Sequence, residues 1–249
     1  MNINVIIPIA GAGSRFANAG YTKPKPFIDV LGKPMVVQVL ENLACKDTRY
    51  IIIAREDHLQ QESKLVEKIK NDFEVIFHSI GHLTEGAACT VLHARKFINN
   101  DEPMIIANSD QIVDVNFQDY VNDCLERDLD GSIMTFKDPG KSTKWSFART
   151  DSEGLVEEVG EKVPISDLAT VGIYMFRRGR DYVDAAVDMV VQNDRVNNEF
   201  YVCPVYNYAI KNGKIFSVYD IPFDSMHGLG TPKDLDIYQK LIGQENETI

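Results

Sequence analysis

The sequence lacks an excess of positive charge. Lysine and arginine number 26 against 37 aspartates and glutamates, which gives a formal net charge of −11. A protein that holds DNA or RNA neutralises phosphates with a basic face, so nucleic acid is not an expected partner. The overall field also repels small polyanions, so any anionic ligand has to be held by a few cations that act at short range.

Long apolar runs and paired cysteines are also missing. No apolar stretch approaches the ~20 residues that a membrane span requires, and the N-terminus shows no charged region followed by an apolar one. The four cysteines are far apart and form no C-x-x-C pair (Cys45, Cys89, Cys124 and Cys203). We therefore expect a cytoplasmic protein with no membrane partner, whose thiols are free and buried.

Short β-branched runs alternate with stretches of helical periodicity through the first half of the chain. This alternation is typical of βαβ units around a mostly parallel sheet. Strands are predicted at Ile3–Ile9, Tyr50–Ala54, Phe73–His78 and Met104–Ala107, and helices after Pro34, over Glu56–Lys70 and from a Thr84 cap to about Ile98. The predicted class is α/β, a Rossmann-like three-layer sandwich with a mostly parallel mixed central sheet.

The second half of the chain has a different pattern. Four strand candidates are separated only by turns, at Gly131–Phe136, Trp145–Arg149, Leu155–Val159 and Ala169–Phe176. Helices are predicted near Asp181–Gln192, Pro204–Lys211 and Pro232–Leu241, with a strand at Lys214–Tyr219. Because no linker or internal repeat interrupts the 249 residues, we expect one domain over residues 1–249.

The stretch VIIPIAGAGSRF, from Val5 to Phe16, turns from an apolar strand into a glycine loop. A dinucleotide-binding loop needs a third glycine where this chain has Phe16, and a Walker-type P-loop needs a G-K-[ST] tripeptide that is absent. What remains is a short glycine loop whose backbone N–H groups can approach phosphate oxygens. Arg15 adds a cation beside it, as do Lys23 and Lys25 in the segment TKPKP.

Six motifs follow one another along the chain: GAGSRF…GYTKPKPFIDVLGKPM, TEGAACTV, NSDQ, EVGEKVPISDLATVGIYMF, NNEFYVCPVY and GLGTPKDL. In type and order they resemble the phosphate loop, base turn, metal aspartate, acceptor E-K motif, acceptor glutamate and C-terminal G-T-P turn of one family. That family is the nucleotidyltransferases that activate sugar 1-phosphates. The resemblance is closest to members found in capsule and surface-polysaccharide loci.

The resemblance implies a GT-A-like nucleotidyltransferase fold and attack of an acceptor phosphate on the α-phosphorus of an NTP. About residues 1–130 would bind the NTP and about residues 131–249 the acceptor. It assigns Arg15, Lys25 and Asp110 to catalysis, Ala10, Gly11, Ala12, Gly13, Glu85 and Gly86 to the nucleotide, and Glu161, Lys162, Gly172 and Glu199 to the acceptor. A phosphate monoester is largely dianionic at neutral pH, so the reaction needs no protein nucleophile or general base.

Mg²⁺ is the expected cofactor. Asp110 closes the apolar strand MIIANSD, and a single aspartate at a sheet edge can recruit Mg²⁺ together with substrate phosphates. Members of the family usually carry a second metal aspartate shortly before the G-T-P turn, where this chain has Gly228. Asp224 is predicted to replace it as the second metal ligand, with the adjacent His227 as the alternative.

Several positions leave the substrates open. Many members of the family carry a glutamine before the base turn, where this chain has Ser79–His82, so a pyrimidine nucleotide is expected but UTP, dTTP and CTP stay open. Gly172 is expected to let the acceptor approach the backbone. Trp145 precedes Ser146, where relatives have a glycine, and core packing is its expected role. The segment around Glu199 could equally cap a helix.

Three other functions are compatible with the sequence. The first is a CTP-dependent cytidylyltransferase that acts on a non-sugar phosphomonoester such as phosphocholine. The second is a glycosyltransferase of the related fold, with NSDQ acting like a D-x-D motif. The G-x-G-x-R loop and the E-K motif argue against it, because such an enzyme uses a nucleotide-sugar and does not need to bind a triphosphate. The third is a nucleotide-sugar sensor without activity. The sequence is also compatible with a homo-oligomer and does not encode its order.

Overall fold

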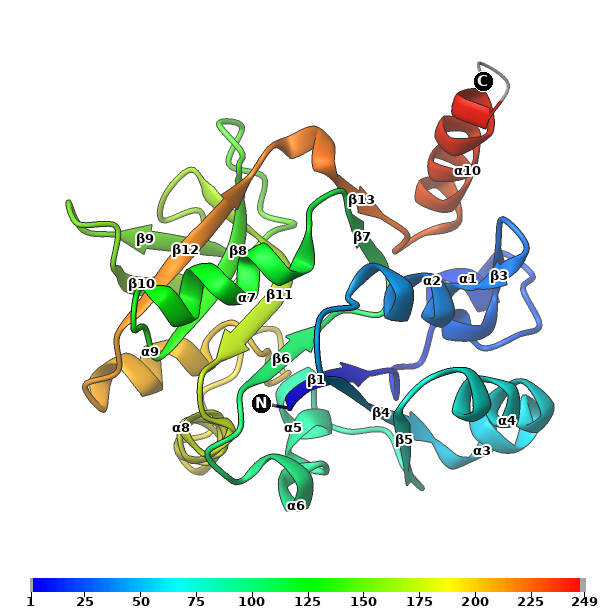
Figure 1. The fold of residues 1–249 in the computed structure, drawn as a ribbon, viewed down its shortest axis with the longest axis horizontal. Coiled ribbons are helices and arrows are strands. Elements are labelled where there is room, and N and C mark those ends of the chain that lie inside the picture. The colour runs from blue at the N-terminus through cyan, green and yellow to red at the C-terminus, as the bar shows by residue number, and fades with distance from the viewer. Residues whose placement is uncertain (1, 247–249) are drawn as a thin grey trace.

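The central sheet is built from apolar runs in both halves of the chain. The computed structural model describes residues 2–246, and nine of its strands form one sheet in the order β10-β9-β11-β6-β1-β4-β5, with β8 beside β11 and β12 beside β8 (Figure 1). The strands are β1 Ile3–Pro8, β4 Thr48–Arg55, β5 Val75–Ile80, β6 Met104–Ala107, β8 Gly131–Lys137, β9 Phe147–Thr150, β10 Val156–Gly160, β11 Leu168–Phe176 and β12 Phe216–Ile221.

The two halves of the sheet differ in strand direction. Strands β6, β1, β4 and β5 are parallel neighbours. Strand β11 runs antiparallel to both β6 and β8, and β9 and β10 form an antiparallel pair. The carboxyl ends of the parallel strands therefore meet at one edge, and β11 joins the second half of the chain directly to β6. The predicted α/β class with a mixed sheet is confirmed.

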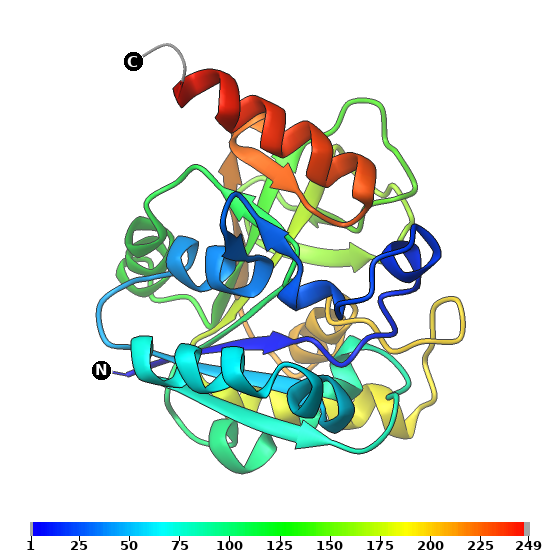
Figure 2. The same cartoon turned by 90° about the vertical axis from the view of Figure 1, so that its right-hand side faces the viewer.

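Alternate side chains of the central strands enter two separate hydrophobic cores. On β1, Val5 and Ile7 belong to one core and Ile6 to the other, and all three are fully buried. Helices cover both faces of the sheet: α2, α4, α7 and α10 pack on the first core, and α5, α6, α8 and α9 on the second (Figures 1 and 2). Strands buried on both faces form continuous apolar runs, which made them visible in the sequence.

The helices and the smaller ladders complete the fold. The helices are α1 Ser14–Asn18, α2 Met35–Asn42, α3 Glu56–Gln61, α4 Ser63–Asp72, α5 Ala87–Leu92, α6 Arg95–Ile98, α7 Phe117–Glu126, α8 Gly179–Val191, α9 Val205–Lys211 and α10 Pro232–Asn246. Two 3-10 turns, η1 Lys25–Phe27 and η2 Phe223–Ser225, lie near the sheet edge. Two short antiparallel ladders join β2 Asp29–Val30 to β3 Lys33–Pro34, and β7 Gln111–Val113 to β13 Met226–Gly228.

The predicted strands are all present, with ends that differ by a few residues. Two helix predictions are corrected. The helix expected over Glu56–Lys70 is divided at Glu62 into α3 and α4. The helix expected from a Thr84 cap to about Ile98 begins only at Ala87 and is divided after Leu92 into α5 and α6. The Thr84 hydroxyl donates to the Gly86 carbonyl oxygen instead of capping a helix. Helix α7 was not predicted, although the Asn116 side chain caps it by accepting from the Gln118 N–H.

Two expectations from the absences in the sequence can be compared with the structure. Over residues 2–246, no helix has both the length and the apolar character needed to cross a membrane. The four cysteines are free thiols; Cys124 and Cys203 are buried, whereas Cys45 and Cys89 are only half-buried. Burial raises the pKa of the Cys124 thiol to about 12, so it stays protonated at neutral pH.

Helices α6 and α8 meet where α8 begins, and a substitution there tests how closely they approach. A Cβ atom on Gly179 would lie 2.0 Å from the Ile98 carbonyl oxygen, which is backbone and cannot move away easily. We predict that Gly179→Ala lowers the free energy of unfolding by about 2–3 kcal/mol, measured by chemical denaturation. Gly243→Ala in α10 is the control, since its Cβ would meet open space and the change should add up to about 1 kcal/mol. Equal stability of Gly179→Ala and the wild type would contradict the close approach.

Candidate active site

Two loops predicted to act together emerge side by side from the sheet. Strands β1 and β6 are parallel neighbours, so the glycine loop after β1 and the turn that carries Asp110 after β6 lie at the same edge. The Ile9 N–H still donates to the Ile53 carbonyl oxygen at 2.8 Å, so the chain leaves the sheet only at Ala10. Ala10 is buried, whereas Gly11 and Ala12 are exposed to the solvent. The edge of the sheet therefore presents an open glycine loop.

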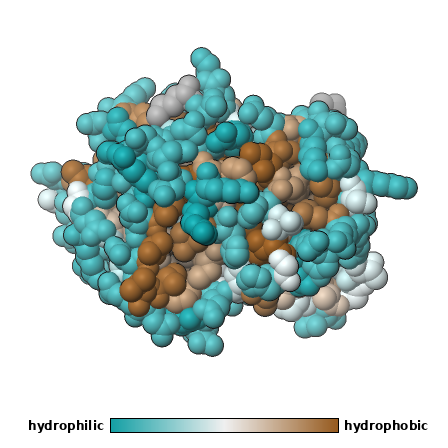
Figure 3. Space-filling view, turned by 90° about the horizontal axis from the view of Figure 1, so that it is seen from below, coloured by the Kyte–Doolittle hydropathy of each residue, from teal (hydrophilic) through white to brown (hydrophobic). Residues whose placement is uncertain are grey.

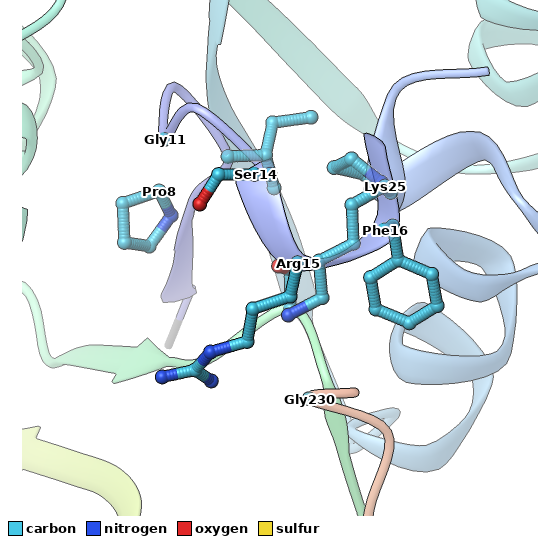
Figure 4. Close-up of a pocket in the computed structure, with 11 residues that line it drawn as sticks. Pro8, Gly11, Ser14, Arg15, Phe16, Lys25 and Gly230 are labelled. Carbon is cyan, nitrogen blue, oxygen red and sulfur yellow. The ribbon is translucent and has the colours of Figure 1, made fainter. Parts of the chain in front are cut away.

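The short helix α1 aims Arg15 into the space beside this loop. Gly13 starts α1 in the left-handed conformation, with φ of 62°, which favours glycine. Phe16 is fully buried and packs edge-on against Tyr21, with ring centroids 5.2 Å apart, and so anchors the helix. Arg15 is exposed, extends away from Phe16 and makes no ion pair with another residue of the described range 2–246 (Figure 4). Phe16, which excluded a dinucleotide loop, thus fixes the direction of Arg15.

Lys25 forms an ion pair with Asp110. Lys25 opens η1 between two prolines, and its ammonium donates to Asp110 Oδ2, with side chains that are 17% and 24% exposed respectively. Its Nζ also lies 5.8 Å from the centroid of the Phe16 ring. The Lys25 and Arg15 side chains extend in the direction of Gly230, which belongs to the C-terminal G-T-P turn (Figure 4). Three residues predicted to be catalytic are thereby brought together from three segments of the chain.

Two cavities meet at these side chains. One of about 290 Å³ is lined by the glycine loop, Arg15 and Lys25. The other, of about 820 Å³, is lined by Arg15, Asp110, Asn108 and Gln111, and by α10. Arg15 and Gly230 line both cavities, so the two spaces adjoin. The arrangement offers one volume beside the glycine loop and a second, larger volume on the far side of Arg15.

The structure separates Asp224 from Asp110. Gly228 lies opposite Gln111 in the β7–β13 ladder, next to Asp110, whereas Asp224 is exposed in η2 four residues earlier. The Ser225 carbonyl oxygen, next to Asp224, accepts from the Asp114 N–H at 2.8 Å, so this part of the chain lies beside Asp114, four residues from Asp110. His227 Nε2 lies 2.6 Å from Asp114 Oδ2 and is engaged there. Asp224 lines neither cavity beside Arg15, whereas His227 lines the larger one together with Asp110 but is paired with Asp114.

The carboxylate that does face Asp110 belongs to Asp234. A Cβ on Gly230 would lie 3.3 Å from Asp110 Oδ2 and 3.9 Å from Asp234 Oδ2, so the glycine keeps the space between these two carboxylates open. The Asp234 N–H donates to the Thr231 hydroxyl at 3.1 Å, as at a helix N-cap, and the same hydroxyl donates to the Asp234 carboxylate at 2.7 Å. Over residues 2–246, no three His, Cys, Asp or Glu side chains are grouped so that they could hold a metal ion.

Gly172 lies where β11 approaches the Asp110 turn. It adopts φ of 94° at the point where the register of β11 against β8 is interrupted, and its carbonyl oxygen accepts from the Asn108 N–H at 3.1 Å. A Cβ there would lie 2.1 Å from Asn108 Nδ2 and 2.5 Å from Gln111 Oε1. The place of a Cβ is thus occupied by protein side chains, and the glycine permits β11 to approach the Asp110 turn. Its predicted role toward the acceptor stays a prediction.

Glu161 is a buried carboxylate at the end of β10. It is 8% exposed, and the Ser146 hydroxyl donates to its Oε2 atom. Burial raises the pKa of Glu161, while the hydrogen bond from Ser146 and the charge of Lys162 act in the opposite direction. Ser146, which stands where relatives have a glycine, therefore orients the predicted acceptor glutamate.

Lys162 is held by Tyr201. The Lys162 ammonium donates to the Tyr201 hydroxyl at 2.7 Å and lies 4.6 Å from the centroid of the Tyr201 ring. Lys162 also adopts a left-handed backbone with φ of 57°, which is uncommon for a lysine and is often found at functional sites. The predicted E-K motif is thus presented in a fixed conformation from β10, with Tyr201 as its support.

The predicted base turn is packed against the segment that carries Tyr201. Gly86 has φ of 122°, and a Cβ there would lie 2.4 Å from the Phe200 carbonyl oxygen. The Phe200 N–H donates to the Glu85 carbonyl oxygen, and its carbonyl oxygen accepts from the Ala88 N–H. Arg195 donates to the Glu85 carboxylate at 2.6 Å and stacks 4.1 Å from the centroid of the Phe200 ring. Backbone contacts therefore link the Glu85–Gly86 turn to the support of Lys162.

Glu199 lies in a tight turn of that segment. Val196 and Glu199 exchange backbone hydrogen bonds of 3.0 Å, and the two asparagines between them both have positive φ. This geometry is that of a two-residue hairpin turn, and it excludes the alternative that NNEF caps a helix. Glu199 is exposed, and no described residue forms an ion pair with it.

Trp145 combines core packing with a place at the cavity wall. It is half-buried and meets Phe136 edge-on, with ring centroids 5.3 Å apart, as expected for a packing residue. It also lines the larger cavity, and Lys144 Nζ lies 4.4 Å from the centroid of its ring. Strand β9 begins only at Phe147, so Trp145 belongs to the loop before the strand and not to the strand itself.

Sequence reasoning missed the supporting side chains. Five residues contact predicted site residues, and none was singled out for such a role: Asn108, Gln111, Ser146, Arg195 and Tyr201. Asp234, also not singled out, lines the larger cavity together with Asp110. Asn108 and Gln111 flank Asp110 in the NSDQ motif, so their proximity could have been foreseen. Nothing in the sequence indicated that Tyr201 meets Lys162, because 39 residues separate them.

The buried charge of Glu161 gives a prediction about stability. A carboxyl whose folded-state pKa is raised stabilises the fold below its unfolded pKa, and this contribution is lost as the pH rises through the folded pKa. We therefore predict that Glu161→Gln has the same melting temperature as the wild type near pH 4 and a higher one at pH 7–8. Melting curves across this pH range measure the difference. Glu153→Gln, in an exposed turn, is the control and should leave the difference near zero. A Glu161→Gln variant that melts below the wild type at pH 8 would contradict the buried-charge account.

Comparison with known proteins shows which family the chain resembles. A family model described as nucleotidyl transferase matches residues 4–214. The chain is 30% identical over 179 residues to the mannose-1-phosphate guanylyltransferase catalytic subunit beta of Drosophila pseudoobscura pseudoobscura, covering 69% of this chain and 47% of that protein. The chain thus spans about half the length of the curated relatives that it matches.

Solved structures agree over nearly the whole chain. A nucleoside-diphosphate-sugar pyrophosphorylase from Vibrio cholerae RC9 is 25% identical and has a TM-score of 0.82, covering 95% of this chain and 99% of that one. An inositol-1-phosphate CTP transferase from T. maritima, 15% identical, shares the fold with a TM-score of 0.74 over 96% of this chain and 94% of its own. With the glycine loop, Arg15, Lys25 and Asp110 assembled as the motifs predicted, the chain belongs to the nucleotidyl transferase family.

Proposed function

We propose that this protein joins an NTP to a sugar 1-phosphate or a related phosphomonoester, giving a nucleotide-linked product and pyrophosphate. The observation that carries the proposal is the convergence of an unpaired Arg15 with Lys25 and Asp110 around adjoining cavities at the carboxyl edge of the sheet. On a chain with net charge −11, an arginine without an ion-pair partner beside an open glycine loop marks a position for phosphate. The names of the relatives, which transfer nucleotides to sugar phosphates, support the same reaction.

The proposed chemistry needs only positioning and charge neutralisation. An oxygen of the acceptor phosphate forms a bond to the α-phosphorus, and the bond from the α-phosphorus to the bridging oxygen breaks, so pyrophosphate takes the electron pair. The second pKa of a phosphate monoester is near ~6, so the attacking group is already a dianion at neutral pH. Arg15 and Lys25 would hold the non-bridging oxygens as charge develops on the leaving group.

Mg²⁺ is part of the proposal. Mg²⁺ prefers one or two carboxylates together with phosphate oxygens and water, and Asp110 and Asp234 are the two carboxylates among the side chains that line the larger cavity. The missing Cβ of Gly230 keeps the space between them open, so the residues present fit the ion. Asp110 would hold it, and Asp234 is better placed than Asp224 to assist. When bound, Mg²⁺ would add positive charge at the phosphates of the donor.

The acceptor would lie between the E-K motif and the Asp110 turn. The Glu161 carboxylate can accept hydrogen bonds from hydroxyl groups of a sugar, and Lys162 can meet the acceptor phosphate. Glu85 and Gly86 would read the edge of a base, with a pyrimidine expected. The resemblance of the motifs to members from capsule loci supports surface polysaccharide as the destination of the product, made in the cytoplasm.

A second candidate function keeps the reaction and changes the acceptor. The larger cavity has an apolar wall formed by Trp145, Phe223 and Ile237, and the last two side chains are 55% and 57% exposed. A sugar needs hydroxyl-binding groups, whereas this wall suits an acceptor with an apolar or aminoalkyl part. CTP-dependent transfer to a non-sugar phosphomonoester is therefore the alternative to a sugar 1-phosphate.

One assay tests both candidates. UTP, dTTP, CTP, GTP and ATP are each combined with a panel of sugar 1-phosphates and other phosphomonoesters, and pyrophosphate release is followed with a coupled pyrophosphatase. We expect turnover with at least one pair of substrates. This turnover should require Mg²⁺ and should be abolished by EDTA. No turnover with any pair, combined with sugar transfer from a nucleotide-sugar, would overturn the proposal in favour of a glycosyltransferase.

Two lysines of the same segment provide a matched pair of variants. We predict that Arg15→Ala, Lys25→Ala and Asp110→Asn each lower kcat by about 10²–10³-fold, because each removes a charge next to the reacting phosphates. Lys23→Ala, two residues from Lys25 and exposed, should retain the wild-type kcat. Full Mg²⁺-dependent activity in Asp110→Asn would show that the metal assignment is wrong.

Tyr201 gives a prediction about positioning. Tyr201→Phe keeps the ring beside the Lys162 ammonium and removes the hydroxyl that accepts from it. Loss of this hydrogen bond is worth about 1 kcal/mol, so the KM for the acceptor phosphate should rise roughly 5-fold while the KM for the NTP stays unchanged. Steady-state kinetics with each substrate varied in turn measure both constants. A change confined to the KM for the NTP would contradict the assignment of Lys162 to the acceptor phosphate.

A further inference from the structure

Another cavity, lined by cationic side chains, lies away from the two active-site cavities, between β5 and helices α5 and α6. It has a volume of about 560 Å³ and is lined by His78, His93, Arg95, Lys96 and Asn99, which we name the histidine pocket. None of these residues lines the two cavities beside Arg15. Helix α6 lies at the lower edge of the molecule in Figure 1, on the side that Figure 3 shows, where the surface is largely hydrophilic between separate hydrophobic patches.

The charged groups that line this pocket carry one sign. On a chain with net charge −11, many cations of the described residues form ion pairs with neighbouring carboxylates, as Arg49, Arg149 and Arg180 do. Arg95 and Lys96 are exposed, and within the described range 2–246 no carboxylate oxygen lies within the 4.0 Å of an ion pair from either of them. No acidic residue lines the pocket. A concave surface with unneutralised cations in an acidic protein is suited to an anion.

The imidazoles add to this arrangement. His78 lies edge-on to Phe97, with ring centroids 6.0 Å apart, and His93 lies edge-on to His82 at 5.6 Å. Burial lowers the pKa of His78, as do the charges of Lys96 and His93, and the pKa of His93 is lowered by burial, His82 and Arg95. The groups of the pocket therefore repel one another when protonated, and a bound anion would relieve this repulsion.

We propose that the histidine pocket is a second anion site, which binds the phosphate group of a small phosphorylated molecule. Arg95 and Lys96 supply the permanent charge, His78 and His93 supply N–H donors, and the Asn99 amide supplies a neutral one. The pocket is connected to the nucleotide side of the protein, because His93 directly follows α5 and α5 begins at the Glu85–Gly86 turn. The proposal does not depend on the proposed reaction.

Histidine NMR of the whole protein tests the site without an activity assay. The probe is sulfate, which is a dianion throughout the titration and has the size of a phosphate group. We expect the pKa of His78 and of His93 to rise saturably by about half a pH unit or more in sulfate compared with chloride at equal ionic strength, about a 3-fold gain in proton affinity. His58, outside the pocket, should not respond.

Two variants decide whether the response belongs to the pocket. Lys96→Gln should remove at least half of the sulfate response of His78 and His93, while Lys68→Gln, an exposed lysine on α4, should leave it intact. Both positions are exposed, so folding should be unaffected, and far-UV circular dichroism checks this. An equal response of His58, or an undiminished response in Lys96→Gln, would overturn the proposal, because either result would mean that sulfate acts on the protein as a whole.

Discussion

The close approach of β11 to the turn after β6 is the contact on which the site depends. Gly172 has no Cβ, and Asn108 and Gln111 occupy the place that a Cβ would take, so the strand of the second half lies directly against the turn that carries Asp110. Any other residue at this position would be strained by the positive φ and would displace the Asn108 and Gln111 side chains. Because Glu161 and Lys162 follow β10, which is joined to β11 through β9, the same contact sets the position of the E-K motif relative to the glycine loop.

Positive charges are grouped at a few places in this protein, although its net charge is negative. An acidic chain repels phosphates at long range, so the cations that act on them must be few and close to their ligand. Arg15 without an ion-pair partner, Lys25 held by Asp110, and the group around Arg95 and Lys96 are examples of this placement. The pair between Lys25 and Asp110 also keeps a carboxylate next to a cation, so neither charge is left alone in the partly buried turn.

The region around Glu161 and Lys162 shows how an arrangement of residues is maintained at a cost in stability. Burial raises the pKa of Glu161, which means that the folded state disfavours its charged form at neutral pH. Lys162 is held with a positive φ, and Gly86 has room only because it lacks a side chain next to the Phe200 backbone. Such features persist because Ser146, Tyr201 and Phe200 hold these residues through hydrogen bonds and packing.

The sequence by itself determined the α/β class, the predicted strands and the identity of Arg15, Lys25 and Asp110, because apolar periodicity and short motifs are local properties. It also showed that Gly228 replaces a family aspartate, but not that Asp234 faces Asp110 while Asp224 does not. Only the tertiary structure decided that question, the role of Gly172 and the support of Lys162 by Tyr201. These three features depend on contacts between residues that are distant along the chain. The packing of strands and loops brings such residues within a few ångströms of each other, and no local pattern encodes these distances.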